Sequence, residues 1–240
     1  MSPTAASPVR TSKRYDAVLF DLLTALIDSW TLWNEVAGDA NAGRRWREQY
    51  LRLTYGAGTY VPYESLVAQA ASEQGLPPVL AKQLAERWGQ LRPWPEAHNV
   101  LTVIGAATRI GVVTNCSNAL GQQAADLVQV PFEVIVTAET AGAYKPRPEP
   151  YRYALDALGL PPERVLFVAG SRHDIPGAGG VGMDVWWHNR VGMPPSPANP
   201  PLVEQRSLGS LPDFLTGAST HDQRSVRPDV DNCPAREGKQ

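Results

Sequence analysis

The sequence predicts an α/β fold in which helices cover both faces of a parallel sheet. Short apolar segments alternate with helical patterns along most of the chain, and this alternation is typical of parallel sheets. Residues 28–96 interrupt the alternation with helical periodicity alone, so we expect a helical cap inserted after the first strand. Hydrophobic residues make up 43% of the 240 residues, which is enough for one sizeable core.

Five short apolar segments are the candidate strands of this sheet. They are residues 15–20, 109–114, 132–136, 165–169 and 183–187. Helical patterns lie between them, for instance at 117–128 and 149–159. Within the cap, helical periodicity occurs at residues 30–33, 46–53, 63–75 and 79–90.

The domain organisation follows from this pattern and from the polar composition of the two ends. Few large apolar side chains occur at either end, and such segments do not bury enough surface to fold. We therefore expect a disordered leader at residues 1–13, a core domain made of residues 14–27 and 97–217, a helical cap at 28–96, and a disordered tail at 218–240.

Charge and composition exclude several kinds of partner. The formal net charge is −2 and the pI is about 6.1, so we expect no nucleic-acid partner. No apolar stretch has the length of a membrane span, and the first residues lack the pattern of a signal peptide. Cys116 and Cys233 are the two cysteines, so a disulfide framework is not expected and a reducing cytoplasm is the predicted location.

Four polar side chains stand at or just beyond the ends of candidate strands. They are Asp21, Thr114, Lys145 and Asp174, in the chain order acid, hydroxyl, lysine, acid. In open parallel sheets the ligand site forms at the carboxyl ends of the strands. The sequence therefore predicts one site that contains all four side chains.

Asp21 is the candidate nucleophile of this site. A carboxylate at the tip of a buried strand is costly to place and needs a functional or structural reason. As a nucleophile it attacks an electrophilic centre and forms a covalent ester, which divides one difficult step into two. The alternative is an acid that caps the next helix.

Two charged residues are expected to work beside Asp21. Lys145 precedes a proline-rich stretch that forbids a helix, and its ammonium group would keep a neighbouring carboxylate ionised. Asp174 would position or deprotonate a water, or cap the following helix. Ser171 and His173 lie in the same turn as Asp174, where His173 is a weaker candidate for a base.

Further candidates for substrate binding come from the second strand and from the cap. Thr114 and Asn115 offer a hydroxyl and an amide to an anionic oxygen, or simply complete a turn. Arg47 offers a guanidinium to a carboxylate or a leaving anion, or is a solvated helix charge. Aromatic residues of the cap wall a pocket or form the cap's own core; they are Trp30, Trp33, Tyr50, Tyr55, Tyr60 and Tyr63.

With these residues in place, the chain resembles the L-2-haloacid dehalogenase branch of the haloacid dehalogenase (HAD) superfamily over residues 14–217. The resemblance lies in Asp21, in the Trp46, Arg47, Gln49 and Leu51 pattern, in the pair Thr114 and Asn115, in Lys145, Tyr151 and Asp174, and in the segment 185–190. It implies a HAD-like Rossmannoid core with a cap after the first strand. It also implies a homodimer.

The resemblance also assigns roles. Asp21 would be the nucleophile, and Arg47 would receive the leaving halide. Lys145 and Tyr151 match the family's lysine and tyrosine, and Asp174 matches the acid thought to manage water.

Several residues depart from the family pattern. Thr24 and Ala25 replace the Gly-Thr pair that follows the nucleophile, so the threonine hydroxyl is lost or moved by one place. Leu23 replaces the usual aromatic, and it is the position where phosphatases of the superfamily carry a second acid. Near the last acid, the family's Ser and Asn become Ala169 and Ser171, and its Trp becomes His173.

We therefore expect a metal-independent hydrolase without a cofactor, most like an (S)-2-haloacid dehalogenase. It would displace a leaving group at an sp3 carbon of a small 2-substituted carboxylate through an aspartyl ester. Leu23, Arg47, Thr114, Asn115, Tyr151, Ser171 and His173 would surround the substrate.

Three alternatives stay open. One is a ring-opening hydrolase of a strained cyclic amino acid such as L-azetidine-2-carboxylate, whose leaving amine needs a proton donor. A second is a Mg²⁺-dependent HAD phosphatase, which lacks an acid at Leu23. A third is a non-catalytic binding protein, favoured by Ala25 and Ala169 but not by the intact acids and lysine.

Overall fold

A computed structural model describes residues 15–195 and 200–217 of the chain. The predicted leader at 1–13 and the predicted tail at 218–240 lie outside the described residues. None of the helices described is long and apolar enough to cross a membrane.

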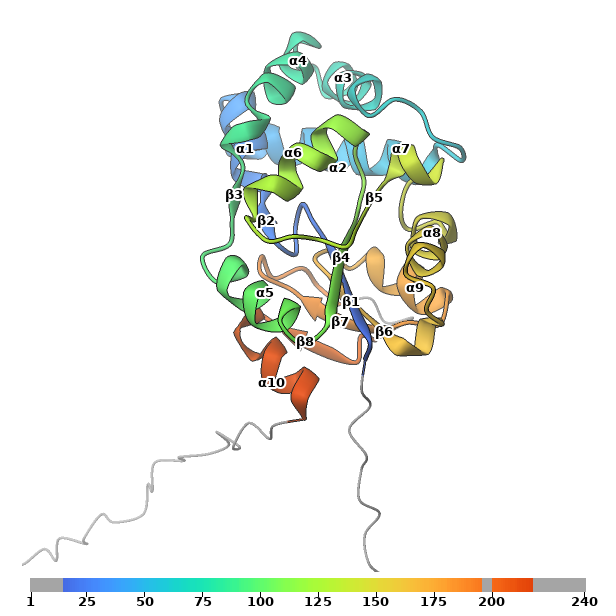
Figure 1. The fold of residues 1–240 in the computed structure, drawn as a ribbon. Coiled ribbons are helices and arrows are strands. Elements are labelled where there is room, and N and C mark those ends of the chain that lie inside the picture. The colour runs from blue at the N-terminus through green and yellow to red at the C-terminus, as the bar shows by residue number, and fades with distance from the viewer. Residues whose placement is uncertain (1–14, 196–199, 218–240) are drawn as a thin grey trace, which may run out of the picture.

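The core of the molecule is a parallel sheet of six strands, as the sequence predicts. The strand order is β5-β4-β1-β6-β7-β8, and every neighbouring pair is parallel. β1 therefore lies at the centre of the sheet, between β4 and β6 (Figure 1). The strands are β1 (Ala17–Asp21), β4 (Arg109–Thr114), β5 (Val134–Thr137), β6 (Val165–Ala169), β7 (Asp184–His188) and β8 (Val203–Gln205).

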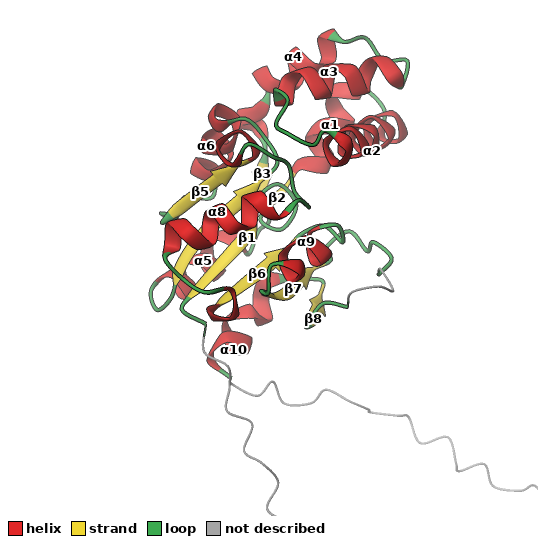
Figure 2. Cartoon of the chain, turned by 90° about the vertical axis from the view of Figure 1, so that its right-hand side faces the viewer, coloured by secondary structure: helices red, strands yellow, loops and turns green. Residues whose placement is uncertain are grey.

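Helices cover both faces of this sheet (Figure 2). α8 (Pro148–Leu158) and α9 (Asp174–Gly180) pack on one face, and α5 (Ala97–Gly105), α6 (Asn118–Leu127) and α10 (Leu211–Thr216) pack on the other. Alternate residues of β1 enter the two cores: Val18 and Phe20 face one, Ala17 and Leu19 the other. A strand buried on both faces has a continuous apolar sequence, and this is why β1 is recognisable from sequence.

The helical periodicity of residues 28–96 corresponds to four helices that lie together above the carboxyl ends of the strands (Figure 1). They are α1 (Ser29–Ala37), α2 (Ala40–Gly56), α3 (Tyr63–Glu73) and α4 (Val79–Glu86). Their shared core is aromatic, and its buried members include Trp33, Trp46, Tyr50, Tyr63 and Trp88. Tilted and edge contacts link these rings, with centroids 4.6–5.9 Å apart.

A short antiparallel ladder joins this helical segment to the sheet. β2 (Ile27–Asp28) pairs with β3 (Arg92–Pro93), so the two chain crossings between the segments lie side by side. These two-residue strands are too short to have a periodic signal, and the sequence did not predict them. The division into a core domain and a cap with boundaries at 28 and 96 stays a prediction.

Within the six-stranded sheet, the predicted strands agree with the observed ones to within two residues at each end, and one strand was not predicted. β8 has three residues, two of them polar and exposed. It therefore has neither the apolar alternation nor the continuous apolar run from which a strand is predicted. The described chain also contains the short helix α7 (Ala138–Ala141) and three single-turn helices, η1 (Trp88–Gln90), η2 (Pro162–Arg164) and η3 (Leu208–Ser210).

The crossing of α1 and α2 depends on a glycine. A Cβ added at Gly43 would lie 2.5 Å from the Asn34 Cα, which is closer than backbone and side chain can approach. We expect Gly43→Ala to lower the free energy of unfolding by about 1–3 kcal/mol, because the helices must separate. Urea denaturation measures the change.

Gly56→Ala is the matched control, because it lies in the same helix and an added Cβ would meet nothing within 4 Å. It should leave stability unchanged or raise it slightly, since alanine favours the helix. If both variants change the free energy of unfolding by the same amount, the close approach of the helices at Gly43 does not contribute to stability and the prediction is wrong.

Candidate active site

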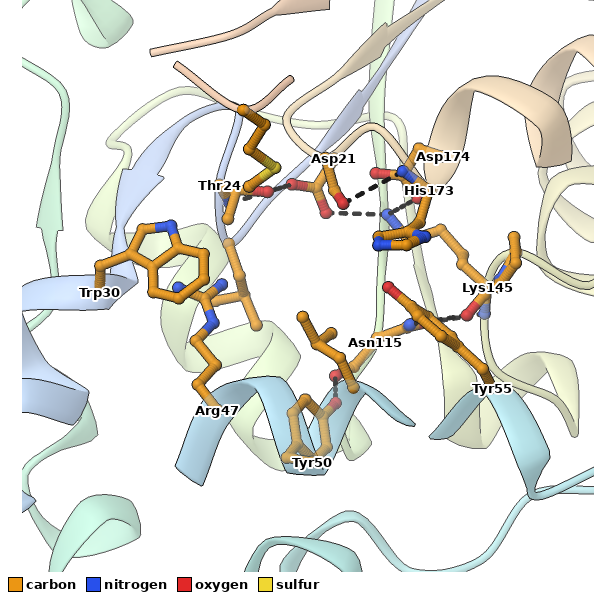
Figure 3. Close-up of a pocket in the computed structure, with 15 residues that line it drawn as sticks. Asp21, Thr24, Trp30, Arg47, Tyr50, Tyr55, Asn115, Lys145, His173 and Asp174 are labelled. Carbon is orange, nitrogen blue, oxygen red and sulfur yellow. Dashed lines mark hydrogen bonds and ion pairs between the residues drawn. The ribbon is translucent and has the colours of Figure 1, made fainter. Parts of the chain in front are cut away.

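The predicted site residues meet where three strands end. Asp21 is the last residue of β1, Thr114 is the last of β4, and Asp174 follows β6 as the first residue of α9. Lys145 comes from the turn between α7 and α8. Figure 3 shows the Lys145 ammonium directed at both carboxylates. Neighbouring parallel strands end at one edge of the sheet, and this brings residues 150 positions apart together.

Both carboxylate oxygens of Asp21 are held by donors. Oδ1 accepts from Lys145 Nζ at 2.8 Å. Oδ2 accepts from the backbone nitrogens of Thr24 at 2.9 Å and Ala25 at 3.1 Å, and also from the Thr24 hydroxyl. The family pattern has a threonine hydroxyl at the position of Ala25. In this chain Thr24, one position earlier, donates the hydroxyl hydrogen bond to Asp21.

The turn that carries these donors is fixed from behind. The Trp94 indole N–H donates to the Thr24 carbonyl at 3.0 Å, and His188 Nδ1 lies 2.7 Å from the Ala25 carbonyl. A carbonyl only accepts, so Nδ1 of His188 carries the proton. Gly170 packs directly against the same turn, because a Cβ added at Gly170 would lie 2.2 Å from the Ala25 nitrogen. The amides that bind Asp21 are therefore oriented before any ligand arrives.

Lys145 is buried rather than exposed on a loop. Its side chain is 3% exposed, and its ammonium lies 3.1 Å from Asp174 Oδ1 as well as 2.8 Å from Asp21 Oδ1. Asn115 clamps the Lys145 backbone, since Asn115 Nδ2 donates to the Lys145 carbonyl at 3.0 Å and Asn115 Oδ1 accepts from the Lys145 nitrogen at 2.7 Å. Tyr50 of α2 donates to the Asn115 carbonyl at 2.7 Å, which ties the helical segment to this clamp.

The two carboxyl groups differ in acidity although they share one lysine. Burial acts to raise the pKa of Asp21, but the Lys145 charge and the donors on Asp21 outweigh burial and hold that pKa below its ordinary value. Burial raises the pKa of Asp174 to about 6, the Asp21 charge adds to this, and Lys145 opposes it. Among the described residues, the Asp174 carboxyl accepts from Lys145 and from Tyr151, whose hydroxyl is 3.1 Å away. Asp21 has more donors, so it keeps the negative charge more firmly.

Arg47 of α2 is buried and not a solvated helix charge. Its guanidinium carbon lies 3.8 Å above the centre of the Trp30 ring. Nη1 is buried and has no hydrogen-bond partner among the described residues. Burial lowers the pKa of Arg47. A buried guanidinium nitrogen without a partner is a ready donor for an anion.

These side chains line a cavity of about 50 Å³. Eight of the ten predicted site residues form part of its wall: Asp21, Leu23, Arg47, Asn115, Lys145, Ser171, His173 and Asp174. The other two lie behind the wall. Tyr151 is bonded to Asp174, and the Thr114 hydroxyl lies 3.7 Å from the Cys116 sulfur. Asp174 makes no cap to α9, so its N-cap interpretation is not met.

The cavity wall also includes residues that the sequence left undecided or did not single out. Trp30, Tyr50 and Tyr55 line the cavity, while Trp33 and Tyr63 belong to the core of the helical segment. The Tyr55 ring lies 4.8 Å from the His173 ring, and His173 is half-buried with a pKa lowered by burial and by Arg172. Sequence offered no means to separate these two groups of aromatics. Thr24, Leu51, Pro146 and Met193 complete the wall.

The residues of the site do not form a metal-binding cluster. Within residues 15–195 and 200–217, no group of three or more His, Cys, Asp or Glu side chains is placed to hold a metal ion. The two acids that face each other are both bonded to the Lys145 ammonium. The Lys145 ammonium therefore offsets part of the negative charge of this pair.

Comparisons with known proteins agree with the geometry. The model of the family described as "Haloacid dehalogenase-like hydrolase" matches residues 18–188. Haloacetate dehalogenase H-2 of Moraxella sp. (strain B) is 26% identical over 84% of this chain and 93% of its own length. (S)-2-haloacid dehalogenase H-109 of Pseudomonas putida is 26% identical over 83% of this chain and 97% of its own length.

A solved structure has the same fold. It is the L-2-haloacid dehalogenase of Xanthobacter autotrophicus with chloropropionic acid covalently bound, which superposes with a TM-score of 0.77 at 20% identity. The match covers 85% of this chain and all of that one.

The buried triad of Lys145 and its two acids makes a testable prediction. Lys145→Met leaves two carboxylates buried without a counterion, so we expect the free energy of unfolding to fall by about 3–5 kcal/mol at pH 7. Without the lysine, both carboxyls bind protons more readily in the folded than in the unfolded state. The loss should therefore shrink as the pH falls.

Urea denaturation at pH 7 and pH 5 measures both effects. Lys82→Met serves as the control, because the Lys82 side chain is 77% exposed. A loss in Lys145→Met that does not change with pH would contradict the counterion role.

Proposed function

The chain belongs to the haloacid dehalogenase-like hydrolases, and from this premise we propose that it is a metal-independent hydrolase of small 2-substituted carboxylates. The reaction resembles that of an (S)-2-haloacid dehalogenase, in which a leaving group is displaced from an sp3 carbon. The observation that carries the proposal is Asp21. It is a buried carboxylate that Lys145 keeps ionised, at the wall of a small cavity.

In the first step an Asp21 oxygen attacks C2 of the substrate. The new bond is a carbon–oxygen ester bond, and the bond from C2 to the leaving group breaks with its electron pair. Charge moves from the carboxylate to the leaving group. Arg47 would receive that anion, because its Nη1 is buried without a partner among the described residues and its guanidinium carbon lies 3.8 Å from the centre of the Trp30 ring.

In the second step water cleaves the ester. Asp174 accepts a proton from the water as the water attacks the Asp21 carbonyl carbon, and the bond from that carbon to the substrate oxygen then breaks. Asp174 returns the proton to this departing oxygen, so the 2-hydroxy acid leaves, and the second proton of the water goes to solvent as the Asp21 carboxylate is regenerated. A carboxyl with a pKa of about 6 is largely ionised at pH 7 and still a useful base. The Ser171 hydroxyl accepts from the backbone nitrogen of His173 at 3.3 Å, and its side chain also hydrogen-bonds Tyr55 in the cavity wall.

In this proposal Asn115 has a supporting role and Thr114 does not contact the substrate. The Asn115 amide is bonded on both sides to the Lys145 backbone, so it acts through the lysine. Thr114 faces Cys116 and stands outside the cavity. The homodimer and the cytoplasmic location stay predictions.

One observation favours a second candidate, the opening of a strained ring such as that of L-azetidine-2-carboxylate. Tyr55 and His173 stand together in the cavity wall, and both carry groups that exchange protons. A departing amine needs a proton, whereas a halide needs none. Burial raises the pKa of Tyr55, with the Asp174 charge adding to it, so the phenol is protonated at pH 7.

Single-turnover hydrolysis in H₂¹⁸O, with enzyme in excess and no added metal, tests the proposal. (S)-2-chloropropionate and L-azetidine-2-carboxylate are tested separately, and the digested protein is analysed by mass. We expect ¹⁸O in the peptide that contains Asp21, because water attacks the carboxyl carbon of the ester. Whichever substrate labels the peptide identifies the leaving group.

Asp21→Asn is the control and should lower turnover by at least about a thousandfold. Labelling of the product alone would mean that water attacks the substrate directly, and the ester mechanism would be wrong. If neither substrate reacts, phosphate esters with Mg²⁺ test the phosphatase alternative.

The acidity of Asp174 predicts the pH dependence of the second step. Asp174 must be deprotonated to accept a proton, and its pKa is raised to about 6. The rate of ester hydrolysis should therefore fall about tenfold per pH unit below pH 6 and level off above it. Because the two acids and Lys145 interact, the midpoint belongs to the cluster.

Tyr151→Phe sharpens this test. The Tyr151 hydroxyl donates to Asp174 and lowers its pKa, so its removal should move the acid limb of the pH–rate profile to higher pH. An acid limb that stays in place would contradict the assignment of Asp174 as the titrating base.

A further inference from the structure

A second and larger cavity adjoins the first. Its volume is about 650 Å³, compared with about 50 Å³ for the inner cavity. The two share six lining residues: Trp30, Leu51, Tyr55, Ser171, His173 and Met193. The inner cavity has room for the reacting end of a small acid, and the outer one has the size of a typical small-molecule site. We call it the outer chamber.

One face of α2 forms a wall of the outer chamber. Arg44, Glu48, Leu51, Arg52 and Tyr55 recur at helical spacing, so they project from the same side. The helix therefore serves both cavities. Arg47, on the adjoining part of α2, reaches the inner cavity.

The outer chamber carries an excess of positive charge. Arg44, Arg52 and Arg172 line it, and Glu48 is its one acidic lining residue. None of these three arginines forms an ion pair with any residue that the structure describes. Arg52 Nε donates to Gln49 Oε1, and Arg172 Nε lies 3.5 Å from His173 Nε2, so most of their donors stay available.

The rest of the lining is largely apolar. Leu51, Val191, Met193 and Pro194 line the outer chamber together with the basic groups, and Leu51 and Met193 also line the inner cavity. The Trp30 indole N–H is buried there and has no partner among the described residues. A ligand that matches this wall has an apolar middle part and an anionic far end.

We infer that the outer chamber binds a second carboxylate of the substrate, at the end of a short apolar spacer. The substrate class is then a dicarboxylate whose reacting end enters the inner cavity. The assignment of that reacting end rests on the proposed function. The second carboxylate would lie among Arg44, Arg52 and Arg172, whose positive charge would also attract it from solution.

Calorimetric binding of adipate and hexanoate tests this inference. The two acids have the same number of carbons, and neither has a leaving group, so no reaction takes place. Adipate should bind roughly tenfold more tightly than hexanoate, because one charge-assisted contact is of that order. The difference should shrink at high ionic strength.

Arginine variants show where the preference comes from. The double variant Arg44→Gln with Arg172→Gln should remove most of the preference for adipate and leave hexanoate binding unchanged. Arg152→Gln is the control, because Arg152 is exposed on α8 and lines neither cavity. Both variants should unfold at the same temperature as the unaltered protein.

Three results would overturn the inference: equal binding of the two acids, no binding of adipate, or a preference that survives in the double variant. If hexanoate binds as tightly as adipate, the outer chamber binds the apolar chain of the ligand and not a second carboxylate. The labelling of Asp21 is a separate measurement. A preference for adipate without labelling would refute the proposed function alone, and labelling without the preference would refute the dicarboxylate alone.

Discussion

The ion triad of Asp21, Lys145 and Asp174 is the interaction on which the rest of the structure depends. Three charged side chains are buried where the strands end, and each is tolerable only because the others are present. Removing the lysine would leave two carboxylates without a counterion. The chain therefore fixes the lysine from several sides, through the two Asn115 bonds to its backbone and through the Tyr50 bond to Asn115.

The triad is asymmetric, and its asymmetry separates the two acids chemically. Asp21 receives the shorter lysine contact and further donors from the turn at Thr24 and Ala25, whereas Asp174 receives the longer contact and one phenol. One carboxyl stays ionised while the other titrates near neutrality. A nucleophile and a base need these two different properties.

The helical segment gives the site its upper wall and its charge pattern. α2 supplies Arg47 and Tyr55 to the inner cavity and Arg44 to the outer chamber. The Tyr50 hydrogen bond to the Asn115 carbonyl joins this helix to the end of β4, and the β2–β3 ladder joins the two chain crossings between the helical segment and the sheet. A shift of α2 along its axis would move all of these groups together. Further hydrogen bonds, from Tyr144 to the Val61 carbonyl and from Ser117 to Glu64, also join the helical segment to the core.

The sequence by itself determined the sheet, the helical insertion and the chain order of the polar strand ends. Continuous apolar runs identify strands such as β1, and a residue at a strand end can be placed at the site without knowing its contacts. Asp21 and Asp174 were predictable for this reason, whereas Lys145 stands in the turn between α7 and α8 and was singled out by the proline-rich stretch that follows it. The two-residue ladder and β8 were not, because short strands with polar residues carry no periodic signal.

Tertiary structure alone decided which side chains face the cavity. Thr24 supplies the hydroxyl to Asp21, Asn115 turns to the Lys145 backbone, and Thr114 turns to Cys116. Arg47 is buried against Trp30, although the sequence also allowed a solvated helix charge. These outcomes depend on contacts between residues far apart in the chain, and local sequence does not encode the distance between such residues.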